Sequence, residues 1–272
     1  MSPTKSTAVL AVIAAVTLMG TTSREASAPQ AGVHPIVDVQ SGMLFGGTVN
    51  GRWTGPRHLA PRLTEGGSYR LYGLTRVLGH ATGGKATSLG APCEDNRIVS
   101  LHPNGNQAGI AVGGDWNALP RPVRAESVRQ PVYQSAVRAL LESHGLRRAR
   151  VNIRQVLRCD LDGDGVEEVL ICASNPIHQG TWKAMRGDYS LVVLRRVIDG
   201  KVKTTLIEQE FHGKDCPNCV PDTFHIAGVL DVNGDGRMEV VTGWQYYEGE
   251  GMTIYEIKGQ KARPVLAWAC GA

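Results

Sequence analysis

The sequence predicts a mainly β protein that consists of antiparallel sheets and one packing helix. Three observations support this class. The chain has 33 glycines but only three phenylalanines among 272 residues, which favours many turns and short strands over long helices. Its apolar runs are short and bounded by Gly, Pro, Asn and Asp, as strands are. Its C-terminal half contains two copies of one pattern, an acidic segment with strand-like flanks. The two acidic segments begin at Asp160 and Asp231, 71 residues apart.

Each copy of this pattern predicts an antiparallel unit of four short strands. In the first copy we expect strands at 151–158, 169–173, 189–198 and 201–211, with a hairpin turn at Asp199-Gly200. In the second we expect them at 223–230, 240–245, 252–257 and 262–268, with a turn at Lys258-Gly259. The first copy is 12 residues longer, and the extra residues fall within 174–188, a predicted surface loop.

Each acidic segment places side-chain oxygens at loop positions 1, 3, 5 and 9, with glycines where the backbone turns sharply. These residues are Asp160, Asp162, Asp164 and Glu168 in the first loop and Asp231, Asn233, Asp235 and Glu239 in the second, with the carbonyls of Val166 and Arg237 at position 7. Ca²⁺ takes six to eight oxygen ligands, so the pattern predicts two calcium sites. The first loop has four carboxylates and the second has three, which predicts tighter binding at the first.

Two other interpretations of these loops are weaker. An EF-hand or dockerin loop ends in a bidentate Glu at position 12 and lies between helices. Position 12 here is Ile171 or Thr242, and the flanking residues are strand-like. Solvated Asp-Gly turns without a metal are the simpler alternative, but such spacing rarely arises twice by chance.

The segments DLDGDGVEE and DVNGDGRME, each followed by an apolar strand, resemble the calcium loops of FG-GAP or VCBS repeats. Such repeats occur in integrin-like β-propellers and in many exported bacterial proteins, where a four-stranded blade carries a cation loop between its first two strands. The resemblance covers residues 151–268 and implies blade-like units of a partial or irregular β-propeller. A closed propeller needs at least four blades. The N-terminal half is therefore expected to form degenerate blades or a different β-rich layer.

Residues 1–28 have the pattern of a signal peptide, which predicts a secreted or periplasmic protein. Lys5 supplies the positive start, residues 8–19 are apolar, and Ala26-Ser-Ala28 offers small residues for cleavage. No later segment approaches the roughly 20 apolar residues of a membrane-spanning helix. The net charge of +4 is too small to indicate nucleic acid as a partner.

Two regions lie between the signal peptide and the C-terminal region of residues 148–272, which holds the repeats at 151–211 and 223–268. Residues 29–125 are turn-rich, with strands expected at 46–53, 67–78 and 98–112. Residues 126–147 contain a linker and one helix, which Pro131 begins and Gly145 ends. The helix has an apolar stripe for packing, composed of Val132, Ala136, Val137, Leu140 and Leu141.

Six cysteines in an exported chain are expected to form disulfides. Fifteen complete pairings are possible, and we favour two bridges, Cys216 with Cys219 and Cys93 with Cys270. Cys159 and Cys172 lie in strands of opposite register and are expected to be buried thiols. Cys216-Pro-Asn-Cys219 resembles a thiol-disulfide oxidoreductase motif, but no predicted helix follows it. A zinc site is a weaker alternative and would use His212, Cys216, Cys219 and His225.

No catalytic set can be named from the sequence, which lacks a Gly-x-Ser-x-Gly motif and has no paired carboxylates outside the acidic loops. Four aromatic residues are candidates for contact with a glycan or an extracellular protein, although packing is their simpler role: Trp182, Trp244, Tyr246 and Tyr247. The last three precede a hairpin tip expected at 248–251, close to the second loop. The sequence thus predicts an exported, calcium-binding, non-catalytic repeat protein. The alternative is an exported hydrolase of a polymer, with its active site in the N-terminal half.

Overall fold

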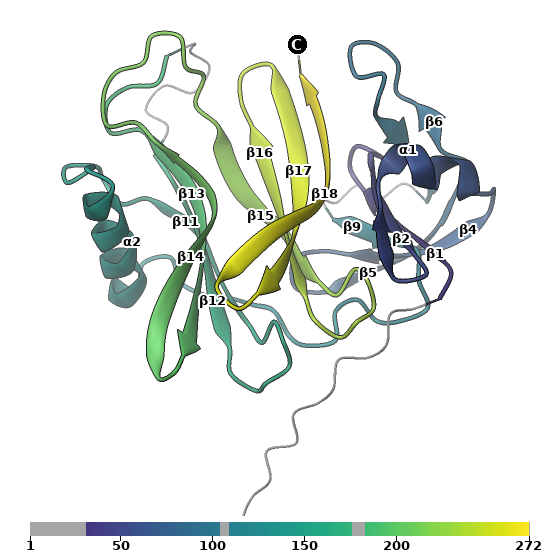
Figure 1. The fold of residues 1–272 in the computed structure, drawn as a ribbon, viewed down its shortest axis with the longest axis horizontal. Helices are drawn as coiled ribbons and strands as arrows, with labels where there is room; N and C mark the ends of the chain where they lie inside the picture. Colours follow the sequence, from purple (N-terminus) through teal and green to yellow (C-terminus); the bar gives the residue numbers. More distant parts are fainter. Residues whose placement is uncertain (1–30, 104–108, 176–182, 272) are drawn as a thin grey trace, which may run out of the picture.

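The structure is a computed structural model that describes residues 31–103, 109–175 and 183–271. The expected signal peptide and Trp182 lie outside the described residues. Within these ranges the protein is mainly β, and its sheets are antiparallel, as predicted. Figure 1 shows three sheets that stand side by side, with a helix at each flank.

The C-terminal half forms two sheets, which we call the first and second repeat sheets. The first consists of β10 (Arg124–Ala125), β11 (Ile153–Cys159), β12 (Glu168–Ser174), β13 (Tyr189–Ile198) and β14 (Lys201–Phe211). The second consists of β15 (Thr223–Leu230), β16 (Glu239–Gln245), β17 (Gly249–Lys258) and β18 (Lys261–Gly271). The first repeat sheet therefore has one strand more than expected, because β10 pairs with β11.

The N-terminal half forms a different β-rich layer, which we call the N-terminal sheet. Its seven strands follow the order β3-β2-β1-β9-β4-β5-β8. They are β1 (Val33–Asp38), β2 (Leu44–Val49), β3 (Arg52–Thr54), β4 (Gly67–Tyr72), β5 (Val77–Gly83), β8 (Leu101–His102) and β9 (Ile110–Val112). A separate pair comprises β6 (Thr87–Ser88) and β7 (Arg97–Ile98), and two short helical turns are α1 (Pro56–Leu59) and η1 (Ala60–Arg62).

The expected N-terminal strands are too long. Segment 46–53 contains a tight turn at Asn50 and Gly51, whose φ angles of 49° and 73° separate β2 from β3. Segment 67–78 likewise divides into β4 and the beginning of β5. Each segment contains its own turn signal, Asn50-Gly51 in the first and Gly73 in the second, so each expected strand runs through a turn that joins two paired strands.

The sheets and helices form successive layers with apolar interfaces. The repeat sheets pack against each other through side chains that include Leu170, Val192, Ile226 and Val240. The other face of the second repeat sheet packs on the N-terminal sheet through side chains that include Phe45, Ile110, Val241 and Trp268. The remaining helix, α2 (Pro131–Ser143), covers the first repeat sheet, and α1 covers the N-terminal sheet. The second repeat sheet is therefore covered on both faces.

Helix α2 begins at Pro131 and is followed by Gly145 with a φ of 80°, as the sequence predicts. Its buried side chains are those of Tyr133, Val137 and Leu141. The expected stripe is wrong at Val132, which is 57% exposed. Tyr133 takes its place because residues spaced by four form one ridge on a helix, and the ring of Tyr133 extends that ridge.

Candidate metal sites

The two acidic loops fold alike. They connect β11 to β12 and β15 to β16, at the lower end of the sheets in Figure 1. In each loop the first Asp accepts hydrogen bonds of 2.7–3.0 Å from two glycine N–H groups, those of Gly163 and Gly165 or of Gly234 and Gly236. The last Glu accepts from the N–H of position 2, at 2.8 Å for Glu168 and 3.0 Å for Glu239. The four glycines have φ angles of 75–86°, which side chains rarely allow.

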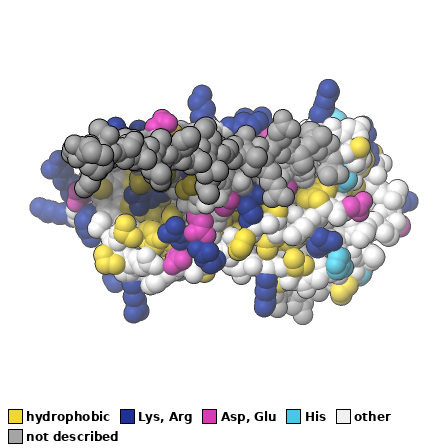
Figure 2. All heavy atoms as spheres, turned by 90° about the horizontal axis from the view of Figure 1, so that it is seen from below, with side chains coloured by type: hydrophobic (Ala, Val, Ile, Leu, Met, Phe, Trp, Pro, Cys, Tyr) yellow, Lys and Arg dark blue, Asp and Glu magenta, His cyan; other side chains and the backbone are white. Residues whose placement is uncertain are grey.

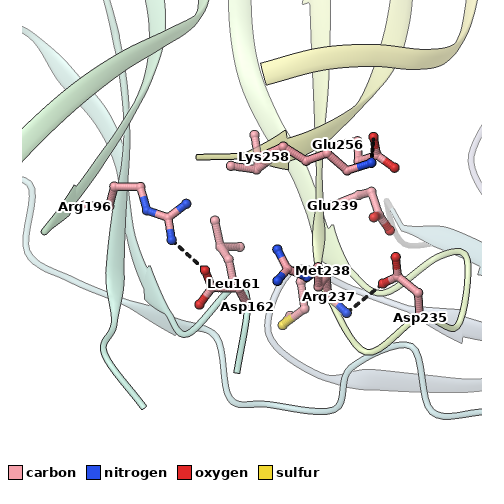
Figure 3. A pocket seen from close by; sticks show the side chains of 10 residues that line it. Leu161, Asp162, Arg196, Asp235, Arg237, Met238, Glu239, Glu256 and Lys258 are labelled. Atoms are coloured by element: carbon pink, nitrogen blue, oxygen red, sulfur yellow. Dashed lines mark hydrogen bonds and ion pairs between the residues drawn. The ribbon is translucent and has the colours of Figure 1, made fainter. Parts of the chain in front are cut away.

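Three carboxylates converge in the first loop. One oxygen from each of Asp160, Asp162 and Glu168 lies within 4.8 Å of the others, and no other such group of His, Cys, Asp or Glu is found among the described residues. Arg196 of β13 pairs with Asp162 at 2.6 Å (Figure 3). It also pairs with Glu168 at 3.2 Å. Oδ1 of Asp162 is buried and has no hydrogen-bond partner. Asp164 is exposed, and the loop brings together three of the four carboxylates expected as ligands.

The second loop is more deeply buried and less convergent. Asp231, Asn233 and Glu239 are only 4%, 7% and 1% exposed. The amide Nδ2 of Asn233 lies 3.3 Å from Oδ2 of Asp235 and 3.4 Å from Oε1 of Glu239. An uncharged amide, in place of a guanidinium, therefore donates to these carboxylates.

The loops meet where the two repeat sheets pack together. The N–H of Met238 donates to the carbonyl of Leu161 at 2.8 Å. Arg121, from the segment before β10, donates to three carbonyls of the two loops, those of Asp160 (2.5 Å), Leu161 (2.9 Å) and Gly236 (2.9 Å). A cavity of about 20 Å³ lies between the loops, with Asp162, Arg196, Asp235, Glu239 and Glu256 in its wall (Figure 3).

Burial makes the loop carboxyls hard to ionise. Loss of hydration raises the pKa of Glu168 to about 7 and that of Asp231 to about 6, and it holds the pKa of Glu239 well above the usual range. Backbone N–H donors oppose this effect in all three. Since a buried charge is costly unless it is paired, positive charge at the loops would favour the ionised carboxylates. Figure 2 shows the loop-bearing end, where acidic and basic side chains lie next to one another near the middle of the face.

Both expected disulfides are present. Cys93 is bonded to Cys270 and Cys216 to Cys219, whereas Cys159 and Cys172 are buried free thiols, as predicted. Disulfides are typical of proteins in an oxidising, extracellular-type environment. In the part of the chain that the structure describes, no helix combines the length and the apolar character that a membrane span needs.

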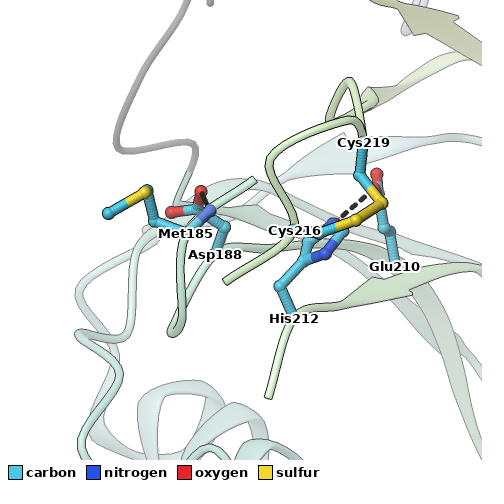
Figure 4. Close-up of a disulfide and its surroundings, with 6 residues drawn as sticks. All are labelled: Met185, Asp188, Glu210, His212, Cys216 and Cys219. Carbon is cyan, nitrogen blue, oxygen red and sulfur yellow. Dashed lines mark hydrogen bonds and ion pairs between the residues drawn. A yellow bond between two sulfur atoms is a disulfide. The ribbon is translucent and has the colours of Figure 1, made fainter. Parts of the chain in front are cut away.

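The Cys216–Cys219 bridge lies in a surface segment next to His212, whose Nε2 is 2.5 Å from Oε1 of Glu210 (Figure 4). Residues 220–222 are not helical, so the helix N-terminus that activates the first thiol of a thioredoxin-type motif is missing. Zinc binding needs thiolates, and both sulfur atoms are bonded to each other. His225 lies on β15 with its ring against Gly243 of β16, and the suggested zinc ligands do not form a site.

Three of the candidate aromatic residues, Trp244, Tyr246 and Tyr247, lie at the opposite end of the second repeat sheet from its acidic loop. β17 begins at Gly249, so the hairpin tip is 246–248 and not 248–251. The expected proximity to the loop is wrong, because β16 runs between them over about 20 Å. The rings of Trp244 and Tyr246 are stacked, with centroids 5.8 Å apart and planes at 8°.

Two open hollows of about 480 and 470 Å³ surround this aromatic pair, and Tyr246 lines both. Tyr247, which is 52% exposed, lines one of them. The remaining wall residues include the Cys93–Cys270 bridge and the acidic side chains of Glu94, Asp95, Glu248 and Glu250. Neither hollow has a Ser or His in its described wall, so neither holds a Ser-His pair.

Comparisons with known proteins identify no relative of this chain. No family model, no curated protein and no solved structure matches the chain. The resemblance to FG-GAP or VCBS repeats accordingly stays a prediction that rests on the two loop sequences and their flanking strands.

Proposed function

We propose that this chain is an exported, calcium-binding, non-catalytic repeat protein whose ions hold adjacent sheets together. One observation carries the proposal: two acidic loops that lie 71 residues apart in sequence fold alike and contact each other between the repeat sheets. Turns that merely face solvent would keep their carboxylates hydrated, because burial of a charge at such an interface is costly. A cation in each loop would compensate the charge of that loop's carboxylates.

The residues present fit a hard cation. In the first loop the ligands would be the side chains of Asp160, Asp162, Asp164 and Glu168 and the carbonyl of Val166. In the second they would be the side chains of Asp231, Asn233, Asp235 and Glu239 and the carbonyl of Arg237. All are oxygen donors, which Ca²⁺ prefers, and the partnerless Oδ1 of Asp162 is an acceptor that lacks a donor. When bound, the ion supplies the positive charge that the buried carboxylates need.

We further propose that the repeat sheets are two neighbouring blades of the FG-GAP type. Each carries its cation loop between two adjacent antiparallel strands, as the resemblance implies. The sheets pack face to face, as adjacent blades do. The N-terminal sheet then closes the open face of the second blade, in place of further blades.

The partner of this module, a glycan or an extracellular protein, would bind at the aromatic hollows. The stacked rings of Trp244 and Tyr246 and the exposed ring of Tyr247 offer apolar faces with polar edges, which suit sugar rings and peptide side chains. This exposed aromatic surface is why we favour binding over the hydrolase alternative, whose active site the sequence places in the N-terminal half.

Removal of calcium tests the proposal. A site held at 100 times its dissociation constant stabilises the folded state by about 2.7 kcal/mol, so thorough chelation should lower the melting temperature by about 5 °C or more. The measurement is thermal unfolding followed by circular dichroism, first with excess chelator and then after calcium is restored.

A double variant, Asp160→Asn with Asp231→Asn, serves as the matched control. It removes the first carboxylate of each loop and should make the melting temperature independent of calcium. The proposal fails if the unchanged protein melts at the same temperature with calcium and with chelator.

A further inference from the structure

Arg196 and Glu256 occupy equivalent positions in the two repeat sheets but carry opposite charges. The strand after each acidic loop pairs with its neighbour in the same register, Val169 with Arg195 and Val240 with Tyr255. The next residue along the neighbouring strand is Arg196 in β13 and Glu256 in β17. Both side chains line the cavity between the loops (Figure 3).

Arg196 is a buried counter-ion of the first loop. Its side chain is 10% exposed and pairs with Asp162 and Glu168. Nη1 donates to the carbonyl of Gly259 in the second repeat sheet at 3.1 Å, which holds the guanidinium in place. Salt and water screen a buried pair much less than an exposed one, so the positive charge of Arg196 acts on the first loop at nearly full strength.

Glu256 adds negative charge beside the second loop. Its cationic partners are Arg263 at 2.8 Å and Lys258 at 3.0 Å, whose side chains are 61% and 69% exposed. Exposed cations of this kind are screened by solvent and contribute little to a neighbouring site. Among the described residues, no buried cation pairs with the carboxylates of the second loop as Arg196 does with those of the first, and Arg121 reaches only a backbone carbonyl there.

We propose that Arg196 makes the first loop the weaker calcium site, so that the second loop fills first. This inference rests on the proposed function, and it reverses the order expected from the number of carboxylates in each loop. A cation that enters the first loop must displace the guanidinium from Asp162 and Glu168 or share their charge with it, because like charges repel at short distance. Binding at the second loop meets no such competitor and gains from the charge of Glu256.

Calorimetric titration of the chelator-treated protein with Ca²⁺ tests this order. The unchanged protein should show two classes of site that differ at least tenfold in affinity. Arg196→Gln should strengthen the weaker class at least tenfold and leave the tighter class unchanged, whereas Arg196→Lys should retain the difference. Arg195→Gln is the matched control, because it removes the same charge from the opposite face of β13 and should leave both affinities within twofold.

Variants that leave Arg196 in place assign each class to a loop, even if the Arg196 variants fail to fold. Asp235→Asn should remove or weaken the tighter class, and Asp162→Asn should affect only the weaker one. The inference is overturned if Asp162→Asn removes the tighter class, or if Arg196→Gln changes neither affinity. A flat titration of the unchanged protein would instead overturn the proposed function, and this inference with it.

Discussion

At the scale of single residues, Arg121 joins the parts of the molecule that the acidic motifs leave separate. Its guanidinium donates to carbonyls of both loops, and it stands between Pro120 and Pro122, which restrict the backbone on either side. A carbonyl at a sharp turn has few other donors within reach. Arg121 therefore fixes how the loops lie against each other whether or not a cation is bound.

Replacement of Arg121 tests this role. Arg121→Ala should lower the free energy of unfolding by about 2 to 4 kcal/mol, because three carbonyls lose a charged donor. The measurement is urea unfolding in the presence of calcium. Arg124→Ala is the control, since Arg124 is 56% exposed and its pair with Glu167 should contribute less than about 1 kcal/mol. Equal losses for the two variants would contradict a special role for Arg121.

The two free thiols show a second effect of position at this scale. Burial raises the pKa of Cys159 and that of Cys172 to about 12, so both thiols stay protonated at neutral pH. The thiolate is the reactive form, and the paired strands place Cys159 opposite Glu168, not opposite Cys172. The protein can therefore keep these two cysteines reduced beside two disulfides, even in an oxidising environment.

At the scale of secondary-structure elements, the sequence predicts correctly those strands and helices whose formation depends on neighbouring residues. The repeat strands follow from alternating apolar residues and turn glycines, and α2 follows from Pro131 and Gly145, because these signals act within a few residues. β1 lies outside the expected strands, since His34 and Pro35 interrupt its apolar pattern. It forms because β2 and β9 pair with it from both sides, which is a non-local condition.

The candidate site likewise has a part that the sequence predicts, the two acidic loops, and a part that it does not, the two arginines beside them. The spacing within nine residues predicts both loops, since each loop is held by hydrogen bonds between its own residues. Arg121 and Arg196 carry no local signal, because they reach the loops only through the packing and pairing of strands. The expected proximity of the aromatic tip to the second loop is wrong for a simpler reason: the loop comes before β16 and the tip after it, so the two lie at opposite ends of that strand.

The buried face of α2, which differs from the expected apolar stripe, supplies a prediction at this scale. Leu141→Ala should lower the free energy of unfolding by about 2 to 4 kcal/mol, because Leu141 is 1% exposed and its removal leaves a cavity against the first repeat sheet. Val132→Ala should cost less than about 0.5 kcal/mol, because Val132 is 57% exposed. Urea unfolding of both variants checks the difference. A larger loss of unfolding free energy for Val132→Ala than for Leu141→Ala would contradict this and support the stripe expected from the sequence.

At the scale of the whole molecule, the second repeat sheet is the layer on which the others depend. It contributes to the apolar cores on both of its faces, and the backbone of its loop contacts the segment before β10 through the carbonyl of Ala118 at 2.8 Å. Its last strand, β18, is bonded through Cys270 to Cys93 of the N-terminal half. The two halves are thus joined by packing and by a covalent bridge.

The size of the loop that each disulfide closes predicts unequal contributions to stability. Cys93 and Cys270 are 177 residues apart, whereas Cys216 and Cys219 are three apart. On the chain-entropy model, removal of the long bridge should cost about 5 kcal/mol and removal of the short one about 2 kcal/mol. The variants are Cys93→Ser with Cys270→Ser, and Cys216→Ser with Cys219→Ser, compared by thermal unfolding in calcium. A larger loss for the long bridge is the expected result, because that bridge removes more conformational freedom from the unfolded chain. Equal losses would contradict this account and would mean that the long loop gains nothing from its length.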